Sequence, residues 1–141
     1  MRSQRFFITM GIVLLLCVMS VKAQQSVMTE EEYSAAMTEI NFLIGDAELH
    51  IDSLYWPELF DDLGKLRTQF EQVEAFWSAR GADEAVGFAQ KILEGLTPIG
   101  AAGDEKDTRA ASSALQALRP TCQSCHDAFR EQGPDGYRIK E

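Results

Sequence analysis

Six large apolar residues recur at alternating spacings of four and three along one stretch of this chain. They are Leu59, Leu63, Leu66, Phe70, Val73 and Trp77. Because this spacing keeps the side chains on one face of an α-helix, it predicts a long helix whose apolar stripe packs against other helices. Pro57 suits the first turn of this helix, and Gly81 suits the position just after its end. The pattern therefore favours a helical bundle.

Three further segments show helical periodicity. The first runs from about Thr29 to Leu49 and opens with three glutamates, which the positive end of a helix dipole favours. The second runs from Asp83 to Leu96, where the punctuating residues of "TPIGAAGD" predict its end. The third starts near Asp104. The positions that we expect to be buried are Tyr33, Met37, Ile40, Ile44 and Ala47; Ala85, Phe88 or Ala89, Ile92 and Leu96; and Ala111, Leu115 and Leu118.

The last of these helices carries an internal proline. Pro120 removes a backbone hydrogen bond and disfavours helical conformation at Arg119, so we expect a kink or break just before Cys122. Gly133 and Pro134 predict the end of the helix, and we interpret residues 135–141 as a polar tail. No segment shows convincing strand alternation. Four amphipathic helices with mostly short connections predict an all-α fold, an antiparallel four-helix bundle.

The N-terminal segment has a different composition. Arg2 and Arg5 precede the apolar run "FFITMGIVLLLCVM", and Val21 and Ala23 stand where a signal peptidase accepts small residues. The run is short for a membrane span, which needs about 20 residues. We therefore interpret residues 1–23 as a cleaved signal peptide, rather than as a membrane anchor, and residues 24–141 as one globular domain.

Signal cleavage makes the chain more acidic and removes one cysteine. The full chain has 13 basic and 22 acidic residues, and the loss of Arg2, Arg5 and Lys22 leaves 10 basic residues and a formal charge of −12. A surface this acidic repels nucleic acid and anionic membranes, so we expect a basic-faced protein partner whose association weakens with salt. Cys17 leaves with the signal, so only two cysteines reach an oxidising compartment.

These two cysteines stand in the stretch "TCQSCHDAFR", residues 121–130. On a helix Cys122, Cys125 and His126 share one face, because they lie three and four residues apart. The pattern C-x-x-C-H is the attachment sequence of a c-type haem, in which two thiols add to the porphyrin vinyl groups and the imidazole binds the iron. We therefore predict one covalently attached haem c, bound by Cys122 and Cys125, with His126 as an iron ligand.

Three other kinds of site use the same residues. A thioredoxin-type pair needs a βαβ context and a low-pKa thiol at a helix N-terminus, and no strand is expected here. A structural zinc site needs four ligands, and beyond this cluster the mature chain offers only His50 and carboxylates. A disulfide between Cys122 and Cys125 would close a very short loop and stabilise little. The export signal, the helical body and the adjacent histidine favour haem attachment.

The stretch "AAGDEKDTRAASSALQALRPTCQSCHDAFR", residues 101–130, resembles the last helix of the class II c-type cytochromes, which include cytochrome c-prime and its low-spin relatives. The glycine-aspartate start, the alanine-rich helix and the aromatic-arginine pair after the histidine all match. The earlier helices are similar in pattern and length only. The resemblance implies a four-helix bundle with haem on the last helix, and a periplasmic electron carrier rather than an enzyme. It also implies a homodimer through the first two helices.

The same resemblance locates the sixth iron position on the first helix. A ligating methionine there implies a low-spin haem suited to electron transfer, and a non-ligating residue implies an open iron that binds small gases such as nitric oxide. Met37, within "YSAAM", is the candidate metal ligand, although the family's frequent arginine four residues earlier is Tyr33 here. An ordinary core role for Met37 stays open. So do a gas-binding haem protein and a haem-free helical interaction module stapled by Cys122 and Cys125.

Several other residues have simpler expected roles. His50 is a weaker candidate for the iron, since a lone histidine beside a loop is more often exposed. Arg119 and Arg130 flank the motif, so either could pair with a haem propionate, or both could be surface residues. The remaining large aromatic residues are expected in the core, with some of them against a porphyrin; these are Trp56, Phe70, Phe76 and Trp77.

Overall fold

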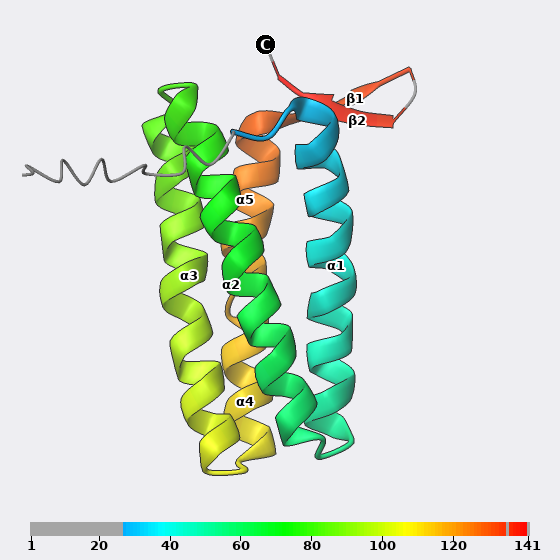
Figure 1. The fold of residues 1–141 in the computed structure, drawn as a ribbon, viewed down its shortest axis with the longest axis vertical. Helices are drawn as coiled ribbons and strands as arrows, with labels where there is room; N and C mark the ends of the chain where they lie inside the picture. The colour runs from blue at the N-terminus through cyan, green and yellow to red at the C-terminus, as the bar shows by residue number, and fades with distance from the viewer. Residues whose placement is uncertain (1–26, 135, 141) are drawn as a thin grey trace, which may run out of the picture.

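The computed structural model describes residues 27–134 and 136–140. The expected signal peptide, residues 1–23, lies outside the described residues. The elements of the described part are α1 (Glu30–Asp52), α2 (Trp56–Ala79), α3 (Asp83–Asp104), α4 (Thr108–Gln116), α5 (Arg119–Phe129), β1 (Arg130–Gly133) and β2 (Gly136–Ile139). The helices stand side by side as an upright bundle in which α4 and α5 follow one another along one rod (Figure 1). The expectation of a mainly helical bundle is confirmed.

In the part of the chain that the structure describes, none of the helices is both long and apolar enough to cross a membrane.

The start of α1 is fixed by a capping box. The Thr29 side chain accepts a hydrogen bond from the Glu32 N–H at 3.2 Å, and the Glu32 carboxylate accepts one from the Thr29 N–H at 2.7 Å. The two bonds satisfy donors that a helix N-terminus would otherwise leave exposed, and the three glutamates of the first turn suit the helix dipole. The predicted start at Thr29 is therefore correct, while the helix continues three residues beyond the predicted end at Leu49.

The core follows the predicted stripes on three of the four rods. All six positions of the apolar stripe of α2 are buried, and in α3 Ala89 is buried rather than Phe88. The predicted positions Ala111, Leu115 and Leu118 of the last rod are buried too. In α1 the buried face is rotated from the predicted one. Ile40 and Ala47 are buried as predicted, but Tyr33 and Met37 are only half-buried. Ile44 is half-buried too, while Ala36, Leu43 and Ile51 complete the buried stripe. This rotation leaves Tyr33 and Met37 at the edge of the core.

The predicted end of the third helix at Leu96 is wrong, because α3 continues through Pro98 to Asp104. Pro98 is on the exposed face, where water can satisfy the carbonyl that its missing N–H leaves free. On the opposite face Ile99 is fully buried and Ala102 is nearly so. Burying these side chains favours helix strongly enough to offset the proline, which local sequence signals alone do not reveal.

The last rod begins later than predicted and breaks close to the predicted place, although Arg119, where Pro120 was expected to disfavour helix, is the first residue of α5. Asp107, not Asp104, caps α4 by accepting a hydrogen bond from the Ala110 N–H at 2.9 Å. The break between α4 and α5 falls at residues 117–118, two residues before Pro120. Leu118 is buried at this break and packs closely on Gly95 of α3, where a Cβ would collide with its side chain. Gly95 therefore lets the broken rod approach α3.

The C-terminal residues form a β-hairpin rather than the predicted polar tail. Strands β1 and β2 pair antiparallel with Arg130 opposite Ile139 and Gly133 opposite Gly136. The "GPDG" stretch was a turn signal, since proline, aspartate and glycine together favour tight turns. The two strands that flank this turn were not predicted, because each has only four residues and neither shows alternating apolar residues. The hairpin lies at the end of the bundle where α1 begins and α5 ends (Figure 1).

Candidate functional site

The C-x-x-C-H motif lies wholly within α5. Cys122, Cys125 and His126 are half-buried, whereas Gln123 and Ser124 between them are exposed. The three chemically active side chains therefore share one inward-facing side of the helix, as predicted from their spacing. Cys122 packs against the hydrophobic core, and both cysteines are free thiols in the structure.

A groove of about 670 Å³ opens beside this side of α5. Its walls come from α5, from the first half of α1 and from the hairpin, and a volume of this size is typical of sites for small molecules and cofactors. Cys125 and His126 line it from α5, and Tyr33 and Met37 line it from α1. The structure thus brings Met37 and two of the three motif residues to one groove, whereas Cys122 packs against the hydrophobic core and does not line it.

The imidazole of His126 is half-buried in this groove. Burial lowers its pKa, and the positive charge of Arg130 lowers it further. In the described part of the chain no hydrogen-bond partner of the imidazole is found, and the neutral ring is the form that binds metals. The histidine is therefore in a suitable state to act as an iron ligand.

The pKa values of the two thiols are shifted in the opposite direction from that of a redox-active cysteine. Burial raises the pKa of Cys122, and burial together with the neighbouring Cys122 raises the pKa of Cys125 to about 11. A thioredoxin-type attacking thiol has a lowered pKa and therefore a large thiolate fraction. Both cysteines are instead protonated at neutral pH, which speaks against the thioredoxin alternative.

An aromatic cluster fixes the inner wall of the groove, and sequence reasoning did not foresee its arrangement. The Tyr33 ring stacks on Phe76 with centroids 4.3 Å apart, and the Trp77 ring meets Phe129 at 5.0 Å. Trp77 Nε1 donates a hydrogen bond to the Tyr33 hydroxyl at 3.3 Å. Burial raises the pKa of Tyr33 to about 12, so its hydroxyl stays neutral. These contacts join α1, α2 and α5 and hold the α1 wall in place.

The arginines that flank the motif lie in different environments. Arg130 lines the groove, at the junction of α5 and β1. Arg119 is exposed and pairs with Glu48 of α1 at 3.1 Å, and it does not line the groove. Of the two, only Arg130 is placed to meet a group bound there.

His50 lies far along α1 from Met37 and does not line the groove. Its Nδ1 donates a hydrogen bond to the carboxylate of Asp62 at 2.7 Å, and the Asp62 side chain is only 6% exposed. This pair ties α1 to α2 near their shared loop. His50 therefore has a structural partner and is not an iron ligand in this arrangement.

Replacing His50 by leucine should lower the free energy of unfolding by about 3 kcal/mol, because it leaves the buried Asp62 carboxylate without its partner. Urea unfolding followed by circular dichroism would measure this loss. The double variant His50→Leu with Asp62→Leu should recover most of the stability. Lys65→Gln is the matched control, since Lys65 pairs with Asp61 on the exposed surface. Equal effects of the two single variants would contradict the assignment.

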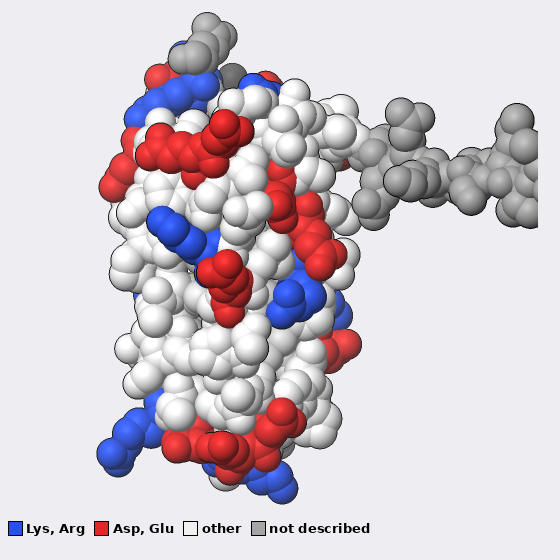
Figure 2. Space-filling model, turned by 90° about the vertical axis from the view of Figure 1, so that its left-hand side faces the viewer, with Lys and Arg blue, Asp and Glu red and all other residues white. Residues whose placement is uncertain are grey.

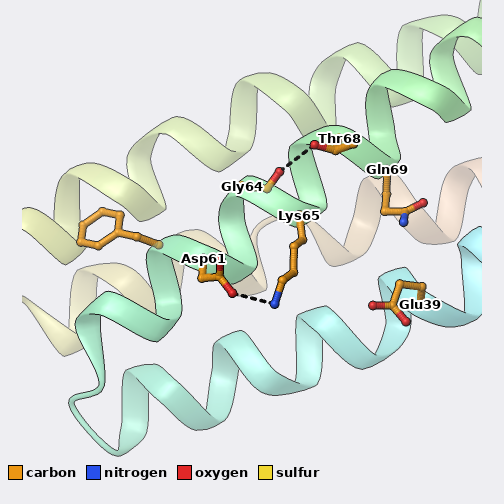
Figure 3. Close-up of a pocket in the computed structure, with 7 residues that line it drawn as sticks. Glu39, Asp61, Gly64, Lys65, Thr68 and Gln69 are labelled. Carbon is orange, nitrogen blue, oxygen red and sulfur yellow. Dashed lines mark hydrogen bonds and ion pairs between the residues drawn. The ribbon is translucent and has the colours of Figure 1, made fainter. Parts of the chain in front are cut away.

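A second groove, between α1 and α2, has a volume of about 350 Å³ and no such chemistry. Figure 3 shows two interactions in its wall: Lys65 pairs with Asp61 at 2.6 Å, and the Thr68 hydroxyl donates to the backbone carbonyl of Gly64 at 3.2 Å. Glu39 and Gln69 line the rest of the polar wall. The lining contains no cysteine, histidine or methionine, so this groove offers no haem or soft-metal ligand.

Among residues 27–134 and 136–140, no group of three or more histidine, cysteine and acidic side chains is arranged to hold a metal ion. The zinc alternative therefore lacks a four-ligand set in this part of the chain. No family model matches the chain, and neither a curated protein nor a solved structure does. The donor set itself fits a covalently attached haem, with two thiols and an imidazole on one helix face and a thioether on the α1 wall.

Proposed function

We propose that the mature chain is an exported, periplasmic monohaem c-type cytochrome that carries single electrons. In this proposal the bundle is an antiparallel four-helix bundle with its haem on the last rod. The observation that carries the proposal is the convergence of Cys125 and His126 from α5 and Met37 from α1 on one groove. The short connections, which alternate between the two ends of the bundle in Figure 1, support the antiparallel arrangement.

Each residue of the motif has a distinct task. Cys122 and Cys125 would hold the haem through two thioether links, each made by adding an S–H bond across a vinyl group so that the sulfur and the hydrogen end on neighbouring carbons. The imidazole of His126 would supply a nitrogen ligand to the iron. When bound, haem supplies an iron that cycles between Fe(II) and Fe(III). Because the links are covalent, the chain retains the cofactor outside the cell.

Met37 favours electron transfer over gas binding. It lines the groove half-buried, and its thioether is a soft donor of the kind that pairs with histidine in cytochromes c. A sixth ligand from the protein occupies the position that a small gas would otherwise take. The gas-binding alternative applies if Met37 packs against the cofactor without ligating it.

A basic-faced redox partner is the expected docking partner. Figure 2 shows the face of the bundle that carries α3, on which acidic side chains gather toward both ends and acidic and basic side chains alternate with uncharged areas between them. The formal charge of the chain is −9, and the expected signal peptide carries none of the acidic residues. Electrostatic steering of a basic partner would show as an association rate that falls with ionic strength.

The wild-type chain, exported with its own signal segment in a host with haem attachment machinery, tests the proposal directly. We expect the purified protein to have the mass of the apoprotein plus one haem, and its Soret band to survive acid-acetone extraction. The same chain produced without residues 1–23 in the cytoplasm is the control and should carry no covalent haem. An exported protein with only the apoprotein mass, less two hydrogens for a cystine, would exclude both haem functions.

A further inference from the structure

The hairpin forms a wall of the groove that the four-helix pattern does not provide. Tyr137, Arg138 and Ile139 of β2 all line it. Ile139 also packs against the hydrophobic core, which attaches the second strand to the bundle. A segment that sequence reasoning assigned to a solvated tail is therefore part of the site.

Backbone hydrogen bonds fasten this wall to the last turn of α5. The Arg130 N–H bonds to the His126 carbonyl, so the first strand starts four residues after the iron ligand. At the same open end of the hairpin, just after β2, the Lys140 N–H donates to the Phe129 carbonyl at 3.0 Å. The position of the hairpin is thus set by the same helical turn that carries His126.

Arg130 is the cation that this wall holds in the groove. Its guanidinium lies over the Tyr137 ring, 4.1 Å from the ring centroid, a distance typical of a cation–π contact. In the described part of the chain Arg130 makes no ion pair, so its N–H groups keep their donor capacity.

The other charged side chains that line the groove are either ion-paired or exposed to solvent. Arg138 pairs with Glu131 at 2.6 Å, and Glu30 pairs with Arg80 at 3.2 Å. Glu31 is exposed in the first turn of α1, where the helix dipole favours its charge. Arg130 is therefore the group with capacity left for an anionic ligand.

We propose that the hairpin, through the Tyr137 ring, holds Arg130 at the groove as the cation that binds a carboxylate of the bound haem. Tyr137 is a positioning residue in this arrangement, because it acts through Arg130. A guanidinium binds a carboxylate by two parallel charge-assisted hydrogen bonds, which fixes orientation as well as charge. The inference rests on the proposed haem function and adds an element outside the C-x-x-C-H motif.

The first experiment compares two arginines that flank the motif. Arg130→Gln should make the reduction potential of the loaded protein more negative, since a cation beside the haem stabilises the reduced state. Arg119→Gln removes the same charge from the exposed partner of Glu48 and should shift the potential much less. Loaded variants whose potentials shift equally would overturn the role of Arg130. Absence of covalent haem from the wild type would instead overturn the proposed function itself.

The second experiment tests the hairpin. Tyr137→Ala should shift the potential in the same direction as Arg130→Gln, and Tyr137→Phe, which keeps the ring, should retain the wild-type value. Hydrogen exchange at the Lys140 amide, which needs no haem, reports whether the hairpin stays closed on Phe129. A protected Lys140 amide with an unchanged potential in Tyr137→Ala would overturn the positioning role. A shift of the potential in Tyr137→Phe as large as in Tyr137→Ala would overturn it as well.

Discussion

Replacing both Cys122 and Cys125 by serine should abolish covalent haem attachment completely. A hydroxyl does not add to the porphyrin vinyl groups as a thiol does, so neither link can form. Single variants should keep one link, because the two side chains lie one turn apart on the same side of α5. Mass spectrometry of the exported chains would count the haem, and a haem stain after denaturing electrophoresis would show whether it is covalent.

Ser124→Ala is the matched control for the cysteine variants. Ser124 lies between the two cysteines in sequence but is exposed, and its hydroxyl donates to the Pro120 carbonyl at 2.9 Å. Its loss should leave haem loading unchanged. The double serine variant should retain its helical circular dichroism, since most of the core lies in α2 and α3. A haem-sized mass increment on the double variant would contradict the assignment of the thiols.

The apolar stripe of α2, from Leu59 to Trp77, shows why the helical part of the fold was predictable. Each of its six residues faces the core, so the spacing seen in the sequence corresponds directly to the face of the helix that packs. The break before Cys122 was predictable for a similar reason, because Pro120 removes a backbone hydrogen bond from the turn that precedes it. Such features depend on neighbours in sequence, and a single sequence contains them in full.

Pro98 and the C-terminal hairpin show where local reasoning ends. Helix α3 continues past Pro98 because Ile99 is buried against the other helices, and that burial exists only in the assembled bundle. The hairpin likewise depends on contacts of Ile139 with the core and of Lys140 with Phe129. Two four-residue strands have little stability of their own. Tertiary contacts decide both segments.

The shared helix face of the candidate ligands was predictable, and the walls of the groove were not. The spacing of Cys122, Cys125 and His126 fixes their shared face on any helix. The half-exposure of Met37 depends on the rotation of α1, which follows from Ala36 and Leu43 turning inward. The alanine at position 36 gave only a weak apolar signal beside the larger Tyr33 and Met37. A small residue can lie at the closest helix contact because it is small, and this outweighs its weak hydrophobicity.

Met37→Ala should convert a low-spin haem into a high-spin one. If the Met37 sulfur is the sixth ligand, its removal leaves the iron five-coordinate, so the weak methionine-to-iron absorption at the red end of the ferric spectrum disappears. The same variant should gain the ability to bind carbon monoxide in the reduced state. Its cost to folding should be modest, about 1 kcal/mol, because the side chain is only half-buried. Absorbance spectra of both oxidation states, with and without carbon monoxide, measure all of these changes except stability.

Met28→Ala provides the control for this experiment, since Met28 and Met37 are the two methionines beyond the expected signal peptide. Met28 is also half-buried, but it lines a different groove between α1 and α2, away from His126. Its replacement should leave the haem spectrum unchanged. If the wild type is already high-spin and Met37→Ala alters nothing, the iron is open and gas binding becomes the better proposal. Because the cysteine variants test attachment and Met37→Ala tests coordination, the two results separate a wrong cofactor from a wrong sixth ligand.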